Sequence, residues 1–209
     1  MGDENVSTGS EPRIASVSAA MVFNDMVNAN VRDGDDARTQ AIIKSGVIDR
    51  QVTWVAELRK RRVPIFWVRV ERRADRRDRV DVLTDAFIAR GQVAERALSR
   101  GPRANNIDEL PIKPEDQEIL KPRFSPFFGT DLDLQLRARG VRTVFLGGIS
   151  TERGVEACAR DGFDLDYSVV VLGDLCWSAN TDQHEWSLTK TLPYFARVMT
   201  STRALQLLD

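Results

Sequence analysis

Six short runs along the chain, most of them largely apolar, are separated by polar stretches or by segments whose apolar residues repeat at helical spacing. The runs cover residues 17–23, 64–70, 117–120, 144–146, 166–172 and 196–201. Short apolar runs that end in polar or glycine-containing turns are typical of strands buried in a parallel sheet. Their alternation with helical segments predicts an α/β fold, namely a three-layer α/β/α sandwich around a mainly parallel, six-stranded Rossmann-like sheet.

The segments between these runs differ in regularity. Residues 30–37 are polar and predict a loop, whereas residues 39–60 have helical spacing that is interrupted near Gly46. Further helices are expected at 82–89, at 131–139 before Gly140, and from Thr181 or Asp182 to position 192. The long stretch 71–116 has no predicted strand, which is typical of a lid or a subunit contact.

Composition narrows the class of protein. The chain has 209 residues, 42% hydrophobic and 29% charged, which suits one domain at 15–209. Residues 1–14 are polar and lack a secretion signal, so we expect a disordered tail. A net charge of −1 gives no reason to expect a nucleic-acid partner, and no apolar run approaches the roughly 20 residues of a membrane span. With only two cysteines, the expected compartment is the cytoplasm.

The most informative stretch is VFLGGISTERGVEACARD at 144–161. An apolar run meets Gly147 and Gly148, and Ser150 and Thr151 then introduce a segment with helical spacing. This order predicts a strand, a tight turn and a capped helix N-terminus. Unpaired N–H groups at such a helix start can receive an anion, although many turns of this kind only connect two elements.

An acidic residue follows the first predicted strand. Asp25 stands at the carboxyl end of that strand, where open α/β sheets bind their ligands. An isolated aspartate after a strand is also a common turn or helix cap.

The stretch at 144–161 resembles the signature of the isochorismatase-like superfamily, also called the cysteine hydrolases. The matching residues are Gly148, Thr151, Val155, Ala159, Arg160 and Asp161. Gly154 stands where the superfamily has its nucleophilic cysteine. Asp25 matches the catalytic acid/base, and Lys121 matches the site lysine at the head of the similar motif KPRFSPFFGTDL. The resemblance implies a hydrolase with a small-molecule substrate, organised as a homodimer or homotetramer.

The glycine changes the chemistry that the resemblance implies. Because Gly154 has no side chain, no covalent acyl-enzyme forms there. Cys158, one helical turn further on, is interpreted as a core thiol. The nicotinamidases of this superfamily add an Asp-x-His metal cluster, whereas this chain has only His184, so we expect no metal and no cofactor.

Four residues are candidate substrate contacts. Ser150 would offer its N–H group, and Asn28 follows Asp25 closely in the sequence. Arg72 lies just beyond the second strand, where it would meet a substrate carboxylate or form surface ion pairs. Phe128 would line an apolar pocket or pack in the core.

Three functional hypotheses follow. The first is a hydrolase that uses Asp25 and Lys121 without a covalent step. True isochorismatases resemble this chain in having glycine at the nucleophile position, so their vinyl-ether substrate is one candidate. The second hypothesis is a non-catalytic member that binds a small acid or a partner chain. The third is a cysteine amidohydrolase whose nucleophile at position 154 has been replaced.

Overall fold

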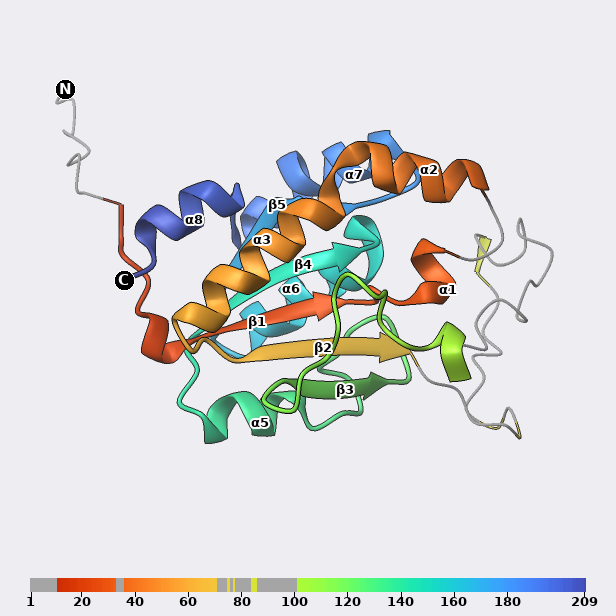
Figure 1. The fold of residues 1–209 in the computed structure, drawn as a ribbon. Helices are drawn as coiled ribbons and strands as arrows, with labels where there is room; N and C mark the ends of the chain where they lie inside the picture. Colours follow the sequence, from red (N-terminus) through yellow and green to blue (C-terminus); the bar gives the residue numbers. More distant parts are fainter. Residues whose placement is uncertain (1–10, 33–35, 71–74, 76, 78–83, 86–100) are drawn as a thin grey trace, which may run out of the picture.

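A computed structural model describes residues 11–32, 36–70, 75, 77, 84, 85 and 101–209, and it is built around a single sheet (Figure 1). The strand order is β3-β2-β1-β4-β5-β6, and all neighbouring strands are parallel. The strands are β1 (Ala19–Asn24), β2 (Ile65–Val70), β3 (Gln117–Lys121), β4 (Thr143–Ile149), β5 (Ser168–Trp177) and β6 (Arg197–Met199). The predicted six-stranded parallel α/β sheet is therefore confirmed.

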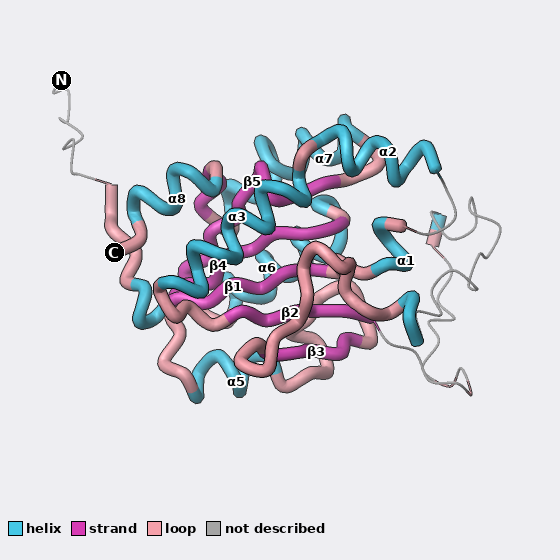
Figure 2. The backbone as a smooth tube through the Cα atoms, viewed as in Figure 1, coloured by secondary structure: helices cyan, strands magenta, loops and turns pink. Residues whose placement is uncertain are grey.

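Helices cover both faces of the sheet and complete the three layers (Figures 1 and 2). The α-helices are α1 (Asn28–Val31), α2 (Asp36–Ser45), α3 (Val47–Lys60), α5 (Leu132–Ala138), α6 (Glu156–Asp164), α7 (Thr181–Trp186) and α8 (Ser201–Leu207). Short 3₁₀ or π segments are η1 (Ser16–Ser18), η3 (Gly101–Arg103), η4 (Thr151–Val155), η5 (Ser187–Thr191) and η6 (Leu192–Tyr194). No helix among the described residues is long and apolar enough to cross a membrane.

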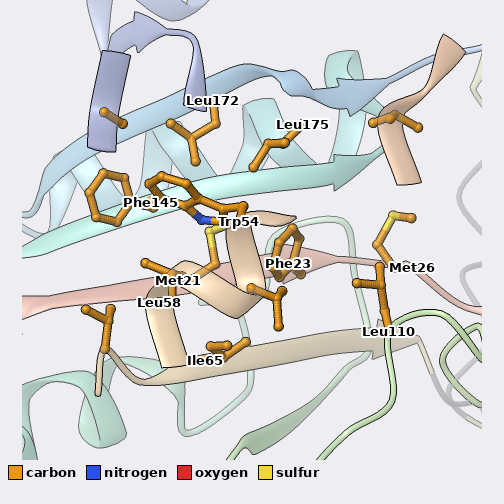
Figure 3. Close-up of a cluster of buried hydrophobic side chains, with 14 of the residues drawn as sticks. Met21, Phe23, Met26, Trp54, Leu58, Ile65, Leu110, Phe145, Leu172 and Leu175 are labelled. Atoms are coloured by element: carbon orange, nitrogen blue, oxygen red, sulfur yellow. The ribbon is translucent and has the colours of Figure 1, made fainter. Parts of the chain in front are cut away.

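Two apolar clusters hold the layers together, one on each face. On the face covered by α2, α3 and α8, Phe23 stacks on Trp67 with ring centroids 4.8 Å apart. Trp54 of α3 meets Phe145 edge to face at 5.3 Å, as the close-up in Figure 3 shows. On the face covered by α5 and α6, the cluster includes Cys158. Alternate residues of β1 enter the two clusters, which is the pattern expected of a central strand.

The strand order reverses next to β1. The chain runs from β1 through β2 to β3 on one side and then returns to β4, which pairs with the other edge of β1. In open α/β sheets the crevice at the carboxyl ends of the strands, where the order reverses, is the usual ligand site. The register pairs Asn24 with Gly148 at this end of the sheet.

Several predicted boundaries need correction. Gly147 and Gly148 lie inside β4, so the turn comes later, at Ser150. The predicted loop at 30–37 overlaps α1 and α2, whereas the predicted break at Gly46 is confirmed, with a φ of 69° between α2 and α3. The helix predicted to start at Thr181 or Asp182 corresponds to α7 at its beginning. Its cap is Asn180, whose side chain accepts from the Gln183 N–H. The helix α8 was not predicted, and the helix expected at 82–89 lies almost wholly outside the described residues.

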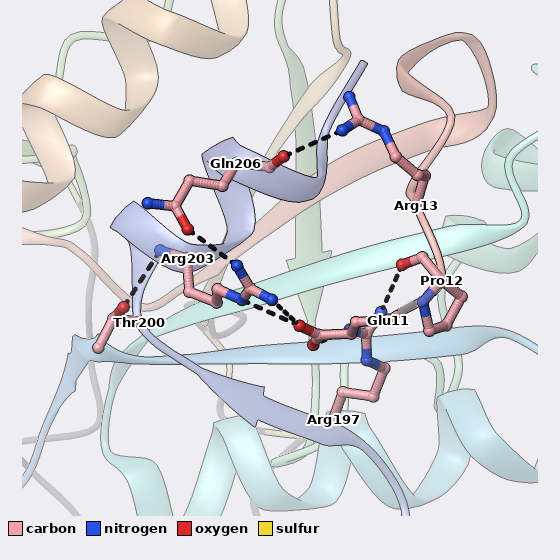
Figure 4. A network of polar contacts seen from close by, with 7 residues as sticks. All are labelled: Glu11, Pro12, Arg13, Arg197, Thr200, Arg203 and Gln206. Carbon is pink, nitrogen blue, oxygen red and sulfur yellow. Dashed lines mark hydrogen bonds and ion pairs between the residues drawn. The ribbon is translucent and has the colours of Figure 1, made fainter. Parts of the chain in front are cut away.

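Residues 11–14, which the sequence analysis assigned to the tail, contact the C-terminal elements of the chain. Glu11 forms ion pairs with Arg197 and Arg203, which joins the N-terminal segment to β6 and α8 (Figure 4). Ile14 pairs with Leu208 and is only 3% exposed. Residues 11–14 are therefore part of the domain, and the rest of the predicted tail, residues 1–10, lies outside the described residues.

Candidate active site

Asp25 follows β1 directly, and its backbone conformation and hydrogen bonds fix the direction of its side chain. Its φ of 55° lies in the left-handed region, which aspartate tolerates better than most residues. Its N–H donates to the Val68 carbonyl at 2.7 Å, and its carbonyl accepts from Asn30 Nδ2 at 3.0 Å. The main chain at Asp25 is thus held from both sides, and its carboxylate is directed toward β3 and Lys121.

Lys121 ends β3 and is 1% exposed. Its Nζ lies 2.7 Å from Asp25 Oδ2, 2.9 Å from the Phe124 carbonyl and 3.3 Å from Asn24 Oδ1. An ammonium group has three N–H donors, so each donor has one acceptor. A buried charge is stable only when it is paired and hydrogen-bonded, and Lys121 meets both conditions.

Gly154 lies in η4 and faces this ion pair. A Cβ atom at position 154 would lie 3.2 Å from Lys121 Nζ and 3.5 Å from Asp25 Oδ2. Any side chain at this position would therefore enter the space beside the carboxylate and the ammonium. The structure thus brings together the three positions that the sequence analysis put forward as catalytic, Asp25, Lys121 and Gly154.

Gly148 explains how η4 comes so close to β1. Its φ is 115°, and a Cβ atom there would lie 2.1 Å from the Asn24 carbonyl oxygen. Only glycine fits both the conformation and the contact. The absence of a side chain lets β4 pack directly on the end of β1, and β4 then leads into η4.

The other predicted contacts have mixed outcomes. Ser150 precedes η4, and its carbonyl accepts from the N–H groups of Arg153 at 3.2 Å and Val155 at 3.4 Å, but its side chain forms no cap, contrary to the prediction. Asn28 Nδ2 donates to the Pro102 carbonyl at 3.0 Å, a link between loops. Phe128 is 62% exposed and so is not a core residue. Arg72 lies outside the described residues, and the substrate-binding roles of all four remain predictions.

Asn24 was missed from the sequence, and the contact of Thr151 with His184 was not predicted. Asn24 is 0% exposed and bonds Lys121; a polar residue at the end of an apolar strand was the available signal. Thr151 Oγ1 lies 2.7 Å from His184 Nδ1, which joins η4 to α7. Burial lowers the pKa of His184, while the negative charges of Glu152 and Glu185 oppose that shift.

The two thiols do not replace a nucleophile at position 154. Burial raises the pKa of Cys158 to about 12, although the charge of Lys121 and the amide of Asn24 act in the opposite direction. Burial also raises the pKa of Cys176. A thiolate is the reactive form of cysteine, so both behave as core thiols, which agrees with the interpretation of Cys158 from the sequence.

A separate open pocket of about 460 Å³ lies on the outer side of η4. Its lining is Glu152, Glu156, Asp182, Gln183, Trp186, Ser187 and Thr191, without Asp25 or Lys121. Among the described residues no group of three or more histidine, cysteine, aspartate or glutamate side chains is arranged to hold a metal ion. Asp25 and Lys121 lie away from this pocket, at the carboxyl ends of β1 and β3 and beside the point where the strand order reverses.

Comparisons with known proteins identify the family to which this chain belongs. Residues 19–203 match the isochorismatase domain. The chain is 36% identical over 152 residues to the uncharacterised isochorismatase family protein YecD of Escherichia coli O157:H7, covering 73% of this chain and 78% of YecD. It is 45% identical over 93 residues to the ureidoacrylate amidohydrolase RutB of Acinetobacter baylyi, covering 44% of this chain and 38% of RutB.

A solved structure agrees with these matches. An isochorismatase family protein from Burkholderia thailandensis superposes with a TM-score of 0.75 and 26% identity, covering 94% of this chain and 100% of that chain. The match to the domain spans all six strands of the sheet and includes Asp25, Lys121 and Gly154. The chain belongs to the isochorismatase family of hydrolases.

Proposed function

We propose that this chain hydrolyses a small, carboxylate-bearing substrate by acid/base catalysis at Asp25, without a covalent enzyme intermediate. The observation that carries the proposal is the position of Gly154. A Cβ atom there would point at Lys121 Nζ and Asp25 Oδ2, at 3.2 and 3.5 Å. We infer that residue 154 is the nucleophile position of the family and that glycine leaves the attack to water.

The proposed reaction needs one group that carries a proton. Asp25 Oδ2 is bound to Lys121, whereas Oδ1 is buried and has no hydrogen-bond partner in the described part of the chain. Oδ1 is therefore the atom that exchanges a proton with substrate or water. Lys121 already has an acceptor for each of its N–H groups, so its role is to hold the Asp25 carboxylate.

For a vinyl ether, the reaction begins with Asp25 protonated at Oδ1, by uptake of a proton from solvent, while Lys121 holds Oδ2. Asp25 gives its proton to the terminal carbon of the double bond, and the ether carbon becomes an oxocarbenium ion. Water adds to that carbon and returns one proton to Asp25. The resulting hemiketal breaks its C–O bond to give a ketone and an alcohol, so one water is consumed. Isochorismate is one candidate of this type.

For an amide or ureide, Asp25 acts first as the base. It takes a proton from water while the oxygen attacks the carbonyl carbon, and it then gives the proton to the departing nitrogen. The similarity to a ureidoacrylate amidohydrolase supports including this class. In either case Gly154 contributes no side chain to the reaction, so water is the attacking group.

The test is a turnover screen by mass spectrometry with purified protein. The panel contains isochorismate, other carboxylate-bearing enol ethers, ureidoacrylate and related amides. Wild type is compared with Asp25→Asn, with Gly154→Cys, and with Asp108→Asn as a matched control on the exposed surface. We expect wild type and Asp108→Asn to turn over one substrate class, and Asp25→Asn to lose at least about 100-fold in rate.

Three results would overturn the proposal. If wild type is silent on the whole panel and Gly154→Cys gains amidase activity, the chain is a scaffold that lacks its nucleophile. If wild type and Gly154→Cys are both silent but wild type binds panel compounds in calorimetry, the chain is a binding protein. Equal rates in wild type and Asp25→Asn would remove Asp25 from the reaction.

A further inference from the structure

Asn24 is a buried amide in a strand that is otherwise apolar. It ends β1, is 0% exposed, and lies in line with Ala20 and Val22, which face the cluster that contains Cys158. Burial of an amide without hydrogen bonds destabilises a fold. The buried amide of Asn24 therefore requires a polar partner within the fold.

The chemistry of its neighbours fixes how the amide is turned. An ammonium group only donates, so the oxygen of Asn24 and not its nitrogen must face Lys121, 3.3 Å away. Nδ2 forms no hydrogen bond of ordinary geometry in the described part of the chain. Asn24 does act on the thiol of Cys158, whose pKa it lowers against the larger effect of burial. The oxygen of the Asn24 amide is therefore committed to Lys121.

Asn24 also lies beside the place where a side chain at position 154 would begin. Its Oδ1 would be 3.5 Å from a Cβ at position 154, and Lys121 Nζ would be 3.2 Å from the same atom. A polar side chain at 154 and the amide of Asn24 would thus compete for the same N–H group of Lys121. With glycine at 154 the amide has no competitor.

We propose that Asn24 is a positioning residue that acts as the third acceptor for Lys121 in place of a polar side chain at position 154. This inference deepens the proposed function and rests on its assignment of residue 154 as the nucleophile position. Asn24 keeps Lys121 directed at Asp25 Oδ2, which leaves Asp25 Oδ1 as the open acceptor. Asn24 and Gly154 then form a coupled pair, so that a change at one alters what the other requires.

The test introduces a thiol at position 154 as a reporter and requires no substrate. Three variants are compared: Gly154→Cys alone, Gly154→Cys with Asn24→Leu, and Gly154→Cys with Asn24→Asp. The rate of iodoacetamide alkylation is measured from pH 5 to 10 by intact-protein and peptide mass spectrometry. Wild type is the control for Cys158 and Cys176, which are buried and should react slowly.

In the Gly154→Cys background, the two Asn24 substitutions should change the alkylation rate in opposite directions. Asn24→Leu releases an N–H group of Lys121 to the introduced thiolate, which lowers its pKa by about one unit and speeds alkylation about tenfold near pH 6.5. Asn24→Asp adds a negative charge and gives Lys121 a second carboxylate, so it raises that pKa and slows alkylation to a similar extent. A structural role in packing alone would not reverse sign between these two variants.

Alkylation profiles that agree within about twofold in all three variants would overturn the proposal. If the leucine variant fails to fold, as judged by circular dichroism, the aspartate variant decides the matter, because it has the shape of asparagine. A slow, unperturbed thiol in every variant would also reject the placement of position 154 beside Lys121. Absence of turnover in the substrate screen would leave this result unaffected, so the two proposals fail independently.

Discussion

Lys121 Nζ lies 2.7 Å from Asp25 Oδ2, and the two residues come from strands separated by β2 in the sheet. The lysine side chain crosses under the end of β2 to reach the aspartate, and it is almost fully buried. Its remaining N–H groups bond the Phe124 carbonyl and Asn24. The Asp25 side chain is 13% exposed, so the carboxylate is more accessible to solvent than the ammonium group of Lys121.

The first prediction concerns this ion pair. Lys121→Met should lower the free energy of unfolding by about 3 kcal/mol, because it leaves a mostly buried carboxylate without its partner. The double variant Lys121→Met with Asp25→Asn should recover part of that loss, since no charge is then stranded. Urea unfolding measures both. A double variant that is no more stable than Lys121→Met would show that the charge pairing is not what stabilises this region.

The second prediction concerns room at position 154. Gly154→Ala adds a methyl group that meets the flexible end of Lys121 at 3.2 Å and replaces glycine by a better helix former. Stability should therefore stay within about 1 kcal/mol of wild type, whereas turnover should fall about tenfold or more because the methyl group enters the site. Thermal unfolding and turnover on the same preparation separate the two effects. Unchanged turnover would mean that substrate does not approach position 154.

The third prediction concerns Gly148, where alanine should be far more destabilising than at position 154. Gly148→Ala should lower the free energy of unfolding by more than about 3 kcal/mol, because its methyl group would overlap the Asn24 carbonyl and its φ is 115°. Urea unfolding beside Gly154→Ala provides the comparison within one stretch of sequence. Similar stabilities of the two variants would contradict the close packing of β4 on the end of β1.

These two glycines also show what sequence could and could not predict. The apolar runs located β1 and β2 within a few residues, because a strand buried on both faces is largely apolar. The prediction for β5 was less accurate, since that strand continues past its predicted end at 172 to Trp177. The apolar runs also did not reveal that β4 continues through Gly147 and Gly148, since a pair of glycines after an apolar run usually marks a turn. The need for glycine at 148 comes from the neighbouring strand, which no local pattern records.

The site was predictable to different degrees. Asp25, Lys121 and Gly154 were found from motifs, and the parallel sheet brings their elements to one edge. Asn24 was not found, because its importance depends on a contact with Lys121 that is 97 residues away in sequence. The helix α8 was missed for a similar reason: it is short and is held by tertiary contacts such as Ala204 in the core.

The fourth prediction concerns the N-terminal segment. Hydrogen bonds and charge from Arg203 and Arg197 lower the pKa of Glu11. A carboxyl whose pKa falls on folding stabilises the fold above its ordinary pKa of 4.5, and that contribution is lost as the pH falls through the lower folded value. Glu11→Gln should therefore unfold at a lower temperature than wild type at pH 7, and the difference should shrink toward pH 3.

The control for this variant is Glu115→Gln, a change at another exposed glutamate. It should show little difference from wild type at either pH. Calorimetry at pH 7 and pH 3 is sufficient for the comparison. If Glu11→Gln matched wild type at pH 7, the contacts of Glu11 with Arg197 and Arg203 would contribute nothing to the stability of the domain, as is true of many exposed ion pairs.

The fifth prediction concerns the link between η4 and α7. Burial lowers the pKa of His184 below its ordinary value of 6.5. The unfolded chain therefore binds a proton more readily than the folded chain, so this contribution to stability is complete above pH 6.5 and is lost as the pH falls below it. Because Thr151 Oγ1 contacts His184 Nδ1 at 2.7 Å, protonation also changes how the start of η4 is held.

Two variants separate the effect of His184 burial on stability from the effect of its hydrogen bond with Thr151. His184→Gln should remove this part of the decline in stability between pH 7 and 5, whereas Thr151→Val should lower stability at every pH and keep the decline, since His184 stays buried. Urea unfolding at half-unit steps of pH provides the curves. If His184→Gln declined as steeply as wild type, another group would titrate in this range, and His184 would not couple the acidity of the medium to the segment that carries Gly154.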